Sequence, residues 1–300
     1  MSMISECAPA KINLALHVTG RRADGYHLLE SLVTFTDTGD QLSFSPASTD
    51  GFSVSGRFAG NVPREGNAGG DNLVVKARDM LRSVLAGAGL AAPPVHIHLE
   101  KNLPVASGIG GGSADAAATL RGVMRLWEIP AGAVDLPTLA LRLGADVPMC
   151  LAGTPLIARG IGEAIEPLRG LPSFAMVLAN PLQPVSTPDV FQALESKANA
   201  PLSLPGELIE AAAWIAAIGN LRNDLEAPAS RLVAEIAVIS GLLAGQGATL
   251  VRMSGSGATC FGIFSDSAQA KAAEAALLSI RPDWYFQATT TISGAQACRA

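Results

Sequence analysis

The strongest constraint on the fold is a glycine-rich segment at 103–117, which reads LPVASGIGGGSADAA. Its glycines lie where a predicted strand at 95–99 ends and a predicted helix from 113 to about 127 begins. Backbone N–H groups without neighbouring side chains can approach an anion closely, and a helix N-terminus adds about half a positive charge. A flexible linker would not lead directly into a helix-forming run. The segment therefore predicts a phosphate-binding loop.

Two well-known phosphate loops do not fit this segment. A Walker loop needs G-x-x-x-x-G-K-[ST], and the segment contains no Gly-Lys pair. A dinucleotide-binding loop needs G-x-G-x-x-G, but counting from Gly108 puts Ser113 in the place of the third glycine. The loop must therefore be of another type.

Composition narrows the class of protein. The 300 residues are 49% hydrophobic and 16% charged, which provides ample material for a core, and the length suggests two domains or one large one. The formal net charge of -5 disfavours broad binding to nucleic acid or to an anionic membrane. The four cysteines form no C-x-x-C pair, and we see neither a signal peptide nor a long apolar run. We expect a cytoplasmic protein with no nucleic-acid or membrane partner, whose oligomeric state stays open.

The order of predicted elements indicates an α+β fold. Apolar residues alternate over Ala10–Val18, and strands follow up to about residue 58, with a hairpin-like turn expected at 38–40. Helices and a strand then alternate less regularly, and a helix is expected over 231–243. We expect a domain boundary near 150–160, with one domain at 1–155 and a second at 156–300.

Three segments together resemble the GHMP kinases, a superfamily that includes galactokinase, homoserine kinase and mevalonate kinase. The loop at 104–113 resembles the second motif of that family. PAKINL at 9–14 is similar to its first motif, and SGSGAT at 254–259 to its third. The resemblance implies a nucleotide-binding N-terminal domain like ribosomal protein S5 domain 2 and a ferredoxin-like C-terminal domain. It also implies a kinase that uses ATP and Mg²⁺.

Two further segments are similar to one branch of this family. They are RADGYH at 22–27 and LGADVP at 143–148. That branch phosphorylates the 2-hydroxyl of 4-diphosphocytidyl-2-C-methyl-D-erythritol in the non-mevalonate isoprenoid pathway. The phosphate loop of the branch often carries Gly or Ala where this chain has Ser107, and Ser where it has Ala114. No role for a hydroxyl at position 114 can therefore be carried over.

Two residues take catalytic roles by this resemblance. Asp146 could simply form a turn after a helix, but the family makes it the general base for the substrate hydroxyl. Lys11 could be a solvated strand lysine, but the family makes it the partner of Asp146 that stabilises developing charge. The resemblance thus predicts that two residues far apart in the sequence meet in one site.

The resemblance also assigns the substrate. Asn13 shares the strand face of Lys11 and is expected to orient the substrate or Asp146. Tyr26 and His27 follow a probable turn and by resemblance bind cytosine, with Phe191 covering the other face of the ring. The partner is thus a small molecule that carries a cytidine diphosphate group.

The expected ATP-binding residues are those of the loop and Asn72, which begins a helix and could equally well be only the first turn of that helix. The loop residues are Pro104, Val105, Ala106, Ser107, Gly108, Ile109, Gly110, Gly111, Gly112, Ser113 and Ala114. No side chain is assigned to the metal. His96 and His98 share a strand face, but no carboxylate or cysteine joins them locally, so an ordinary strand face is favoured. Arg252 and Thr259, which border the third glycine motif, are candidates for lining the site.

Two other functions stay open from the sequence. The first is a GHMP kinase for another alcohol, such as mevalonate or homoserine, which the absence of the Tyr26–His27 pair would have favoured. The second is a catalytically inactive sensor that binds nucleotide, which the loss of Lys11 or Asp146 would have favoured.

Overall fold

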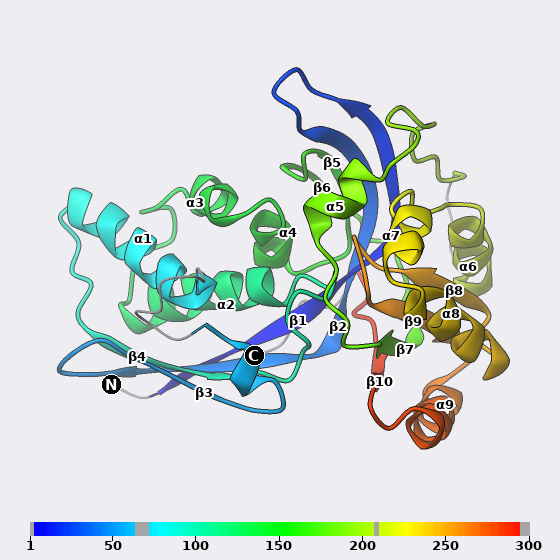
Figure 1. The fold of residues 1–300 in the computed structure, drawn as a ribbon. Helices are drawn as coiled ribbons and strands as arrows, with labels where there is room; N and C mark the ends of the chain where they lie inside the picture. The colour runs from blue at the N-terminus through cyan, green and yellow to red at the C-terminus, as the bar shows by residue number, and fades with distance from the viewer. Residues whose placement is uncertain (1–2, 64–71, 207–209, 295–300) are drawn as a thin grey trace.

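The computed structural model describes residues 3–63, 72–206 and 210–294, and the structural statements below concern these residues. They form two sheets, one of six strands and one of four (Figure 1). The mixed order of helices and strands confirms the expected α+β class.

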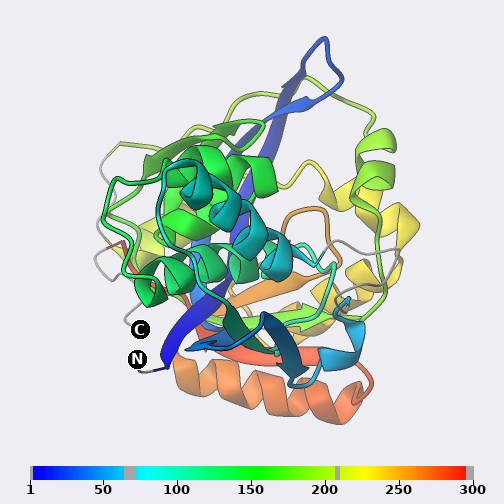
Figure 2. The same cartoon turned by 90° about the vertical axis from the view of Figure 1, so that its left-hand side faces the viewer.

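The first sheet is built on two long strands joined by a hairpin. β1 (Ile4–Arg21) pairs antiparallel with β2 (His27–Pro46) along nearly its whole length. β2 also pairs with β4 and β5, which places it at the centre of the sheet. The end of this hairpin projects beyond both sheets (Figures 1 and 2). The remaining strands are β3 (Gly51–Ser55), β4 (Val95–Glu100), β5 (Leu156–Gly160) and β6 (Ala164–Pro167).

The turn expected at 38–40 is wrong, because β2 continues through it. The register between β1 and β2 instead shifts between Pro9 and Lys11, which marks a bulge in β2 next to Gly39. A Cβ at Gly39 would lie 2.3 Å from the backbone oxygen of Ala8, so glycine here permits close approach of two strands. The glycine that predicted a turn therefore marks a β-bulge.

Helices cover one face of the first sheet (Figure 1). α2 lies directly on β1 and β2, and α1 and α4 pack against α2. The alanine-rich face of α2 allows this close packing, since Ala116, Ala117 and Ala118 are fully buried. The four helices are α1 (Leu73–Gly87), α2 (Gly111–Leu126), α3 (Leu136–Leu143) and α4 (Val147–Ala152).

The second sheet has the strand order β10-β7-β9-β8 with all pairs antiparallel. Along the chain, helices lie between β7 and β8 and between β9 and β10. This arrangement, together with the strand order, is that of a ferredoxin-like domain. Helices α8 and α9 pack on it, and Figure 2 shows α9 lying along one side. Its strands are β7 (Ala175–Asn180), β8 (Leu250–Met253), β9 (Cys260–Phe264) and β10 (Tyr285–Thr290). The helices are α5 (Thr187–Gln192), α6 (Ala211–Gly219), α7 (Glu226–Leu232), α8 (Glu235–Gly245) and α9 (Ser267–Ile280).

The single helix expected over 231–243 is wrong. Helix α7 ends at Leu232, Val233 takes an extended conformation, and α8 begins at Glu235. The two helix axes differ in direction by 116°. Within the described ranges no single helix has the length and apolar character needed to cross a membrane, and this bent pair meets that test by length and composition only.

The first sheet extends past the expected domain boundary at residue 155. β5 pairs with β2, and β6 pairs with β5, so by sheet membership the chain divides between Pro167 and Ala175. The two parts are joined by hydrogen bonds, such as the one donated by the backbone N–H of Ile292 to the Phe35 oxygen at 2.8 Å. The 1–155 and 156–300 division therefore stays a prediction.

His17 on β1 links the first sheet to the second part of the chain and is 2% exposed. Its Nε2 accepts a hydrogen bond from the backbone N–H of Arg222 at 3.3 Å, so Nδ1 carries the proton and donates to the oxygen of Ala200 at 3.2 Å. Burial and the nearby Arg222 charge lower the pKa of His17. The imidazole of His17 is therefore neutral in the folded protein and binds a proton more readily in the unfolded chain.

We expect stability to fall as the pH drops below about 6.5, the unfolded value for histidine. In that window the unfolded chain binds more protons than the folded one, so the free energy of unfolding decreases with falling pH. Urea unfolding at about pH 5.5 and about pH 7.5 measures the effect. His17→Gln should reduce the difference between the two values. An unchanged difference in that variant would show that other groups cause it.

Candidate active site

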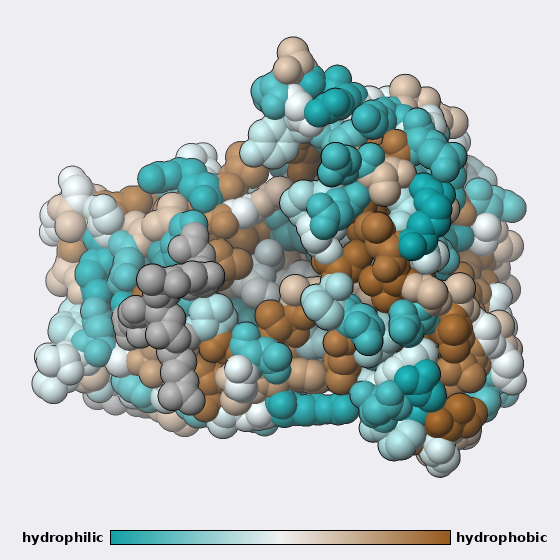
Figure 3. Space-filling view, viewed as in Figure 1, coloured by the Kyte–Doolittle hydropathy of each residue, from teal (hydrophilic) through white to brown (hydrophobic). Residues whose placement is uncertain are grey.

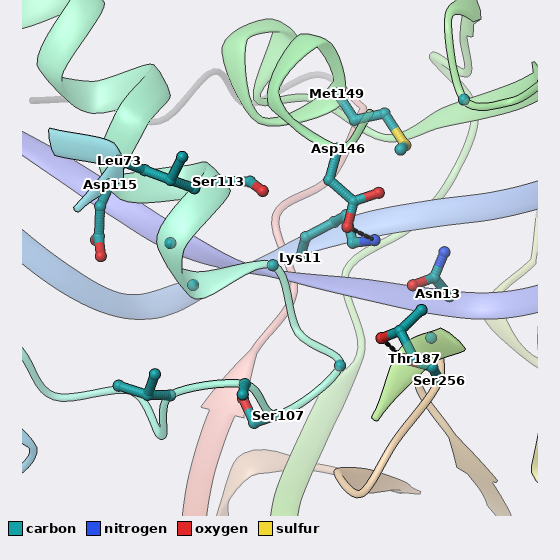
Figure 4. A pocket seen from close by; sticks show the side chains of 18 of the residues that line it. Lys11, Asn13, Leu73, Ser107, Ser113, Asp115, Asp146, Met149, Thr187 and Ser256 are labelled. Atoms are coloured by element: carbon teal, nitrogen blue, oxygen red, sulfur yellow. Dashed lines mark hydrogen bonds and ion pairs between the residues drawn. The ribbon is translucent and has the colours of Figure 1, made fainter. Parts of the chain in front are cut away.

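A cavity of about 490 Å³ lies between the two halves of the chain. Its walls come from β1, β2, α1, the glycine loop, α4, α5 and the loop at 255–257. Figure 3 shows a hollow at the middle of this face, and Figure 4 shows the side chains within it. The three GHMP-like motifs at 9–14, 104–113 and 254–259 all contribute residues to this cavity.

The glycine loop forms the middle of the wall. Gly110 has φ of 64° and caps α2, which begins at Gly111, so the helix N-terminus faces the cavity. Of the expected ATP-binding residues, nine line the cavity: Asn72, Val105, Ala106, Ser107, Gly108, Gly110, Gly111, Gly112 and Ser113. Pro104, Ile109 and Ala114 do not line it, and Ile109 and Ala114 are buried in the cores. The cradle is therefore made mainly of backbone, as an anion site at a helix N-terminus requires.

Backbone contacts join the three motifs. The backbone N–H of Lys11 donates to the Ile109 oxygen at 2.9 Å. The Ser254 hydroxyl donates to the Gly108 oxygen at 3.1 Å and accepts from the backbone N–H of Asn13 at 3.0 Å. The backbone N–H of Thr259 donates to the Ser107 oxygen at 3.1 Å. The shape of the glycine loop is thus set by strand β1 and by the third motif.

Lys11 and Asp146 meet across the cavity. Lys11 Nζ donates to Asp146 Oδ2 at 2.8 Å, and Figure 4 shows this pair beside the start of α2. The lysine side chain is 4% exposed, whereas the aspartate side chain is 39% exposed. Asp146 precedes α4 but its side chain makes no capping hydrogen bond there. One carboxylate oxygen is therefore held by an ammonium group while the carboxylate remains open to the cavity.

Asn13 lies two residues along β1 from Lys11 and lines the same cavity. Its Nδ2 donates to the Ser31 hydroxyl at 2.7 Å, and that hydroxyl donates to the Ala15 oxygen. Its Oδ1 is buried and has no hydrogen-bond partner among the described residues. A buried acceptor without a partner is costly, so this oxygen is suited to a ligand hydroxyl.

Of the three residues expected to bind cytosine, Phe191 lines the cavity, whereas His27 and Tyr26 do not. His27 stacks on Phe191, with ring centroids 4.8 Å apart and an interplanar angle of 18°. Phe191 lines the cavity, and burial, with the charges of Arg21 and Lys197, lowers the pKa of His27. Tyr26 is 62% exposed and does not line the cavity. The structure thus brings two of the three rings together.

Asn72 begins α1 and also lines the cavity. Its Oδ1 accepts from the backbone N–H groups of Val74 and Val75, and its Nδ2 donates to the Pro63 oxygen. It is therefore a helix N-cap first, and its side chain is already engaged.

Arg252 does not line the cavity, contrary to its candidacy. Its guanidinium is buried and donates to the backbone oxygens of Leu14, Ile218 and Leu221. It joins β1 to the second part of the chain. Thr259 is likewise fully buried and accepts from the amide of Asn180 at 2.8 Å.

The sequence analysis missed four polar residues of the wall. Thr187 and Ser256 hydrogen-bond to each other through their hydroxyls at 2.7 Å, at the side of the cavity opposite α2 (Figure 4). Lys101 and Asp115 form part of a buried ionic cluster next to the glycine loop. Lys101 directly follows strand β4, and Asp115 lies in α2, two residues after the loop motif at 104–113. Lys101 and Asp115 could have been found in the sequence as charged residues that flank the glycine-rich loop.

Comparison with known proteins decides the family. The model of the GHMP kinases N terminal domain matches residues 72–154, and that of the GHMP kinases C terminal domain matches 199–281. A protein of Rhizobium leguminosarum bv. trifolii, named 4-diphosphocytidyl-2-C-methyl-D-erythritol kinase, is 63% identical over 97% of this chain and 96% of its own. The chain belongs to the 4-diphosphocytidyl-2-C-methyl-D-erythritol kinase family of GHMP kinases.

Solved structures agree with this membership. A crystal structure of a 4-(cytidine 5'-diphospho)-2C-methyl-D-erythritol kinase superposes with a TM-score of 0.79 at 36% identity, over 96% of this chain and 99% of that one. Homoserine kinase from Cytophaga hutchinsonii gives 0.67 at 19% identity over 99% and 96%, which shows a shared fold. The GHMP kinase fold expected from the motifs is thereby confirmed.

The glycine loop yields a test of the GHMP kinase site. Gly108 has φ of 77°, and a Cβ there would lie 2.6 Å from the Ser254 oxygen. An L-residue in that conformation costs about 1–2 kcal/mol before any clash. We expect Gly108→Ala to raise the Kd of ATP at least about tenfold, measured by titration calorimetry.

Gly89→Ala is the matched control, because Gly89 has a similar φ of 70° but lies outside the cavity. Its added Cβ would meet no described atom within 4 Å. We expect this variant to bind ATP nearly as the parent does. Equal affinity of both variants would contradict a role for the conformation of Gly108 in nucleotide binding.

Proposed function

We propose that this chain transfers the γ-phosphoryl group of ATP to the 2-hydroxyl of 4-diphosphocytidyl-2-C-methyl-D-erythritol. The observation that carries the proposal is the Lys11–Asp146 pair, which faces the cavity beside the glycine loop. The 63% identity to a kinase of that name supports the choice of substrate. The pair also disfavours an inactive nucleotide sensor, since both reactive groups are present and in contact.

The phosphates of ATP fit the wall formed by 108–113. The N-terminus of α2 presents backbone N–H groups and the positive end of the helix dipole there. Transfer requires the terminal phosphate to face Asp146, so the nucleoside must extend the opposite way. That side of the cavity is lined by apolar residues that suit a planar base, including Val62, Leu73 and Leu99.

The chemical step needs a base and a positive charge near the reacting oxygen. The substrate hydroxyl gives its proton to Asp146 as its oxygen forms a bond to the γ-phosphorus. The bond between that phosphorus and the ADP oxygen breaks at the same time, and ADP leaves. Lys11 Nζ, held 2.8 Å from Asp146, stabilises the negative charge of the transferring group. The products are ADP and the 2-phosphate.

Mg²⁺ belongs to the proposal as an ion held chiefly by ATP. Residues 3–63, 72–206 and 210–294 contain no group of three or more His, Cys, Asp or Glu that could form a metal site. Such a wall fits Mg²⁺, which usually keeps waters and binds phosphates with one or two protein oxygens. The hydroxyl of Ser113 is the protein oxygen that would hold it, and it faces the cavity (Figure 4). When bound, the ion neutralises charge on the β- and γ-phosphates.

The cytidine end of the substrate is proposed to reach the His27–Phe191 stack. His27 can hydrogen-bond the edge of a base, and Phe191 and Tyr26 offer flat faces. The exposure of Tyr26 leaves it able to swing over the site from the end of the β1–β2 hairpin. Asn13 Oδ1 is proposed to accept a hydrogen bond from the methylerythritol part. We also propose a cytoplasmic location, where ATP is available.

One assay distinguishes this function from other GHMP kinase activities. ADP release from ATP is measured with the cytidine diphosphate substrate, with mevalonate and with homoserine. We expect turnover with the first alone. Turnover with mevalonate or homoserine instead would overturn the substrate assignment.

Asp146→Asn is expected to lower kcat by about 10²–10⁴, nearer the lower value. The amide keeps the size of the side chain but cannot accept the proton. Dissociation constants for both substrates should stay almost unchanged, because the loss falls on the transition state. Lys11→Met should give a similar loss, and the double variant should lose less than the product of the two. Full turnover in Asp146→Asn would remove this residue from the mechanism.

Phe191→Ala is expected to raise the KM of the cytidyl substrate by about one to two decades, since base–aromatic stacking contributes roughly 1–3 kcal/mol. Tyr26→Ala should raise the same KM, and neither variant should change the KM of ATP. Steady-state kinetics with each substrate varied in turn measures this. Phe52→Ala is the control, because Phe52 lies on the edge strand β3, packs against the hydrophobic core of the first sheet and does not line the cavity. This variant should leave both KM values unchanged. Equal losses for both substrates would indicate a structural role.

A further inference from the structure

Asn13 is held through both its backbone and its side chain. Its backbone N–H donates to the Ser254 hydroxyl at 3.0 Å, and that hydroxyl donates to the Gly108 oxygen of the glycine loop. Its Nδ2 donates to the Ser31 hydroxyl on β2 at 2.7 Å. Asn13 is 2% exposed and Ser31 is 4% exposed, so water competes little for these contacts. The position of Asn13 is thus set by β2 and by the third motif together.

The hydroxyl of Ser31 decides which way the Asn13 amide faces. Ser31 Oγ donates its one proton to the Ala15 oxygen at 2.7 Å. Toward Asn13 this hydroxyl can therefore only accept, and only the Nδ2 end of the amide can donate to it. An amide turned by half a rotation would place Oδ1 against an oxygen that has no proton left to give. Ser31 thus directs Nδ2 toward β2 and Oδ1 away from it.

A β-bulge in β1 accompanies the bond between Ser31 and Ala15. Asn13 pairs with Val33 but Ala15 pairs with Leu32, so two residues of β1 correspond to one residue of β2. The regular ladder is interrupted at such a bulge, and backbone groups there can be satisfied by side chains. The Ser31 hydroxyl does this for the Ala15 oxygen. The orientation of the amide therefore follows from the irregular pairing of the two strands.

The other end of the amide has no protein partner in the described part of the chain. Asn13 Oδ1 is buried and accepts no hydrogen bond there. It lies next to Gly255 of the third motif, where an added Cβ would be 3.4 Å from it. Asn13, Ser31 and Gly255 all line the cavity. Because a buried acceptor without a partner is costly, Oδ1 is suited to a ligand group that donates and not to one that accepts.

The hydroxyl that donates to Oδ1 cannot be the reacting one. The 2-hydroxyl of the substrate has one proton, which the proposed step gives to Asp146. Lys11, which holds Asp146 at 2.8 Å, lies two residues from Asn13 on the same strand face, a separation of roughly 7 Å along β1. Figure 4 shows Asn13 beside this pair. A hydroxyl on a carbon next to the reacting one is placed to bridge that separation, and the substrate carries such hydroxyls at C1 and C3.

We propose that Ser31 is a positioning residue that fixes the Asn13 amide, so that the site selects an alcohol with a second, hydrogen-donating hydroxyl next to the reacting one. The inference rests on the proposed function, because it takes the 2-hydroxyl to react at Asp146. Ser31 acts through Asn13 and not on the substrate. A group at the neighbouring carbon that can only accept a hydrogen bond meets another acceptor and is rejected. With the amide reversed, the site would tolerate that group.

The test compares the natural substrate with two analogues in which fluorine replaces the hydroxyl at C1 or at C3. Fluorine is close to a hydroxyl in size but cannot donate a hydrogen bond. ADP release gives kcat/KM for each compound. We expect the parent protein to lose at least about tenfold in kcat/KM with one of the analogues, because Oδ1 is then left unpaired. Equal use of all three compounds by the parent would overturn the proposal.

Ser31→Ala is the decisive variant. It removes the oxygen that holds Nδ2, so the amide is free to turn its NH₂ group to the substrate. We expect kcat/KM for the natural substrate to fall about tenfold, and the ratio of natural to fluorinated substrate to fall severalfold. The KM of ATP should stay at the parent value. Fluorine weakens the reacting oxygen equally in every variant, so a residue with only a structural role would leave this ratio intact, and that outcome overturns the proposal.

Two conservative variants separate the hydroxyl from the shape of the side chain. Ser31→Thr keeps the hydroxyl and suits a strand, so it should preserve the ratio. Ser31→Cys keeps nearly the same size, but a thiol is a weak donor and a weak acceptor, so its ratio should lie between those of the parent and Ser31→Ala. If Ser31→Ala does not fold, Ser31→Cys decides the matter. A parental ratio in Ser31→Cys would then overturn the proposal.

Asn13→Ala shows whether Ser31 acts through the amide. In that background Ser31→Ala should change the ratio no further, because the two residues act as a unit. A further fall in the double variant would mean that Ser31 acts on the substrate directly, and would overturn the positioning role.

Ser43→Ala is the matched control. Ser43 lies on β2 like Ser31 but does not line the cavity, so the same substitution there should leave all three kcat/KM values at the parent level. The two levels of the argument fail in different ways. Absence of turnover of the natural substrate by the parent would overturn the proposed function. Turnover with an unchanged ratio in Ser31→Ala would overturn the inference alone.

Discussion

The structure depends on the close approach of two backbone segments, the glycine loop and the loop of the third motif. A Cβ at Gly255 would lie 2.7 Å from the Gly108 oxygen, and one at Gly108 would lie equally close to backbone atoms of Gly257. Only glycine on both sides permits this contact. It brings residues about 150 positions apart into one wall, and β1 completes that wall through Lys11 and Asn13. Without this contact between the two loops, the cavity would lack the wall against which a nucleotide can bind.

Two lysines lie beside this wall in different electrostatic settings. Lys11 faces one carboxylate that is open to the cavity, so its charge is available to a ligand. Lys101 lies between two buried carboxyl groups, so its charge is used within the protein. The first arrangement suits a group that acts on a substrate, and the second suits a group that holds backbone in place. Both settings follow from the positions of the two lysines, one on β1 and one directly after β4.

The sequence predicted the local features best. The strand at 95–99 was predicted to within a residue, because strict alternation of apolar residues marks it. Gly39 misled because a glycine between polar residues signals a turn and a bulge equally well. Val233 misled because a branched apolar residue gives no warning of a helix break.

The site was predictable only where a motif exists. Lys11, Asp146 and the glycine loop could be named from the resemblance to GHMP kinases, and the structure brings them into one cavity. Lys101, Asp40 and Asp115 could not be named, because their meeting depends on strand register and on how α2 lies on the sheet. The stack of His27 on Phe191 already buries the two ring faces against each other. A planar ligand that enters there exchanges one ring partner for another, so little new apolar surface leaves water, and the heat capacity change of that step is small.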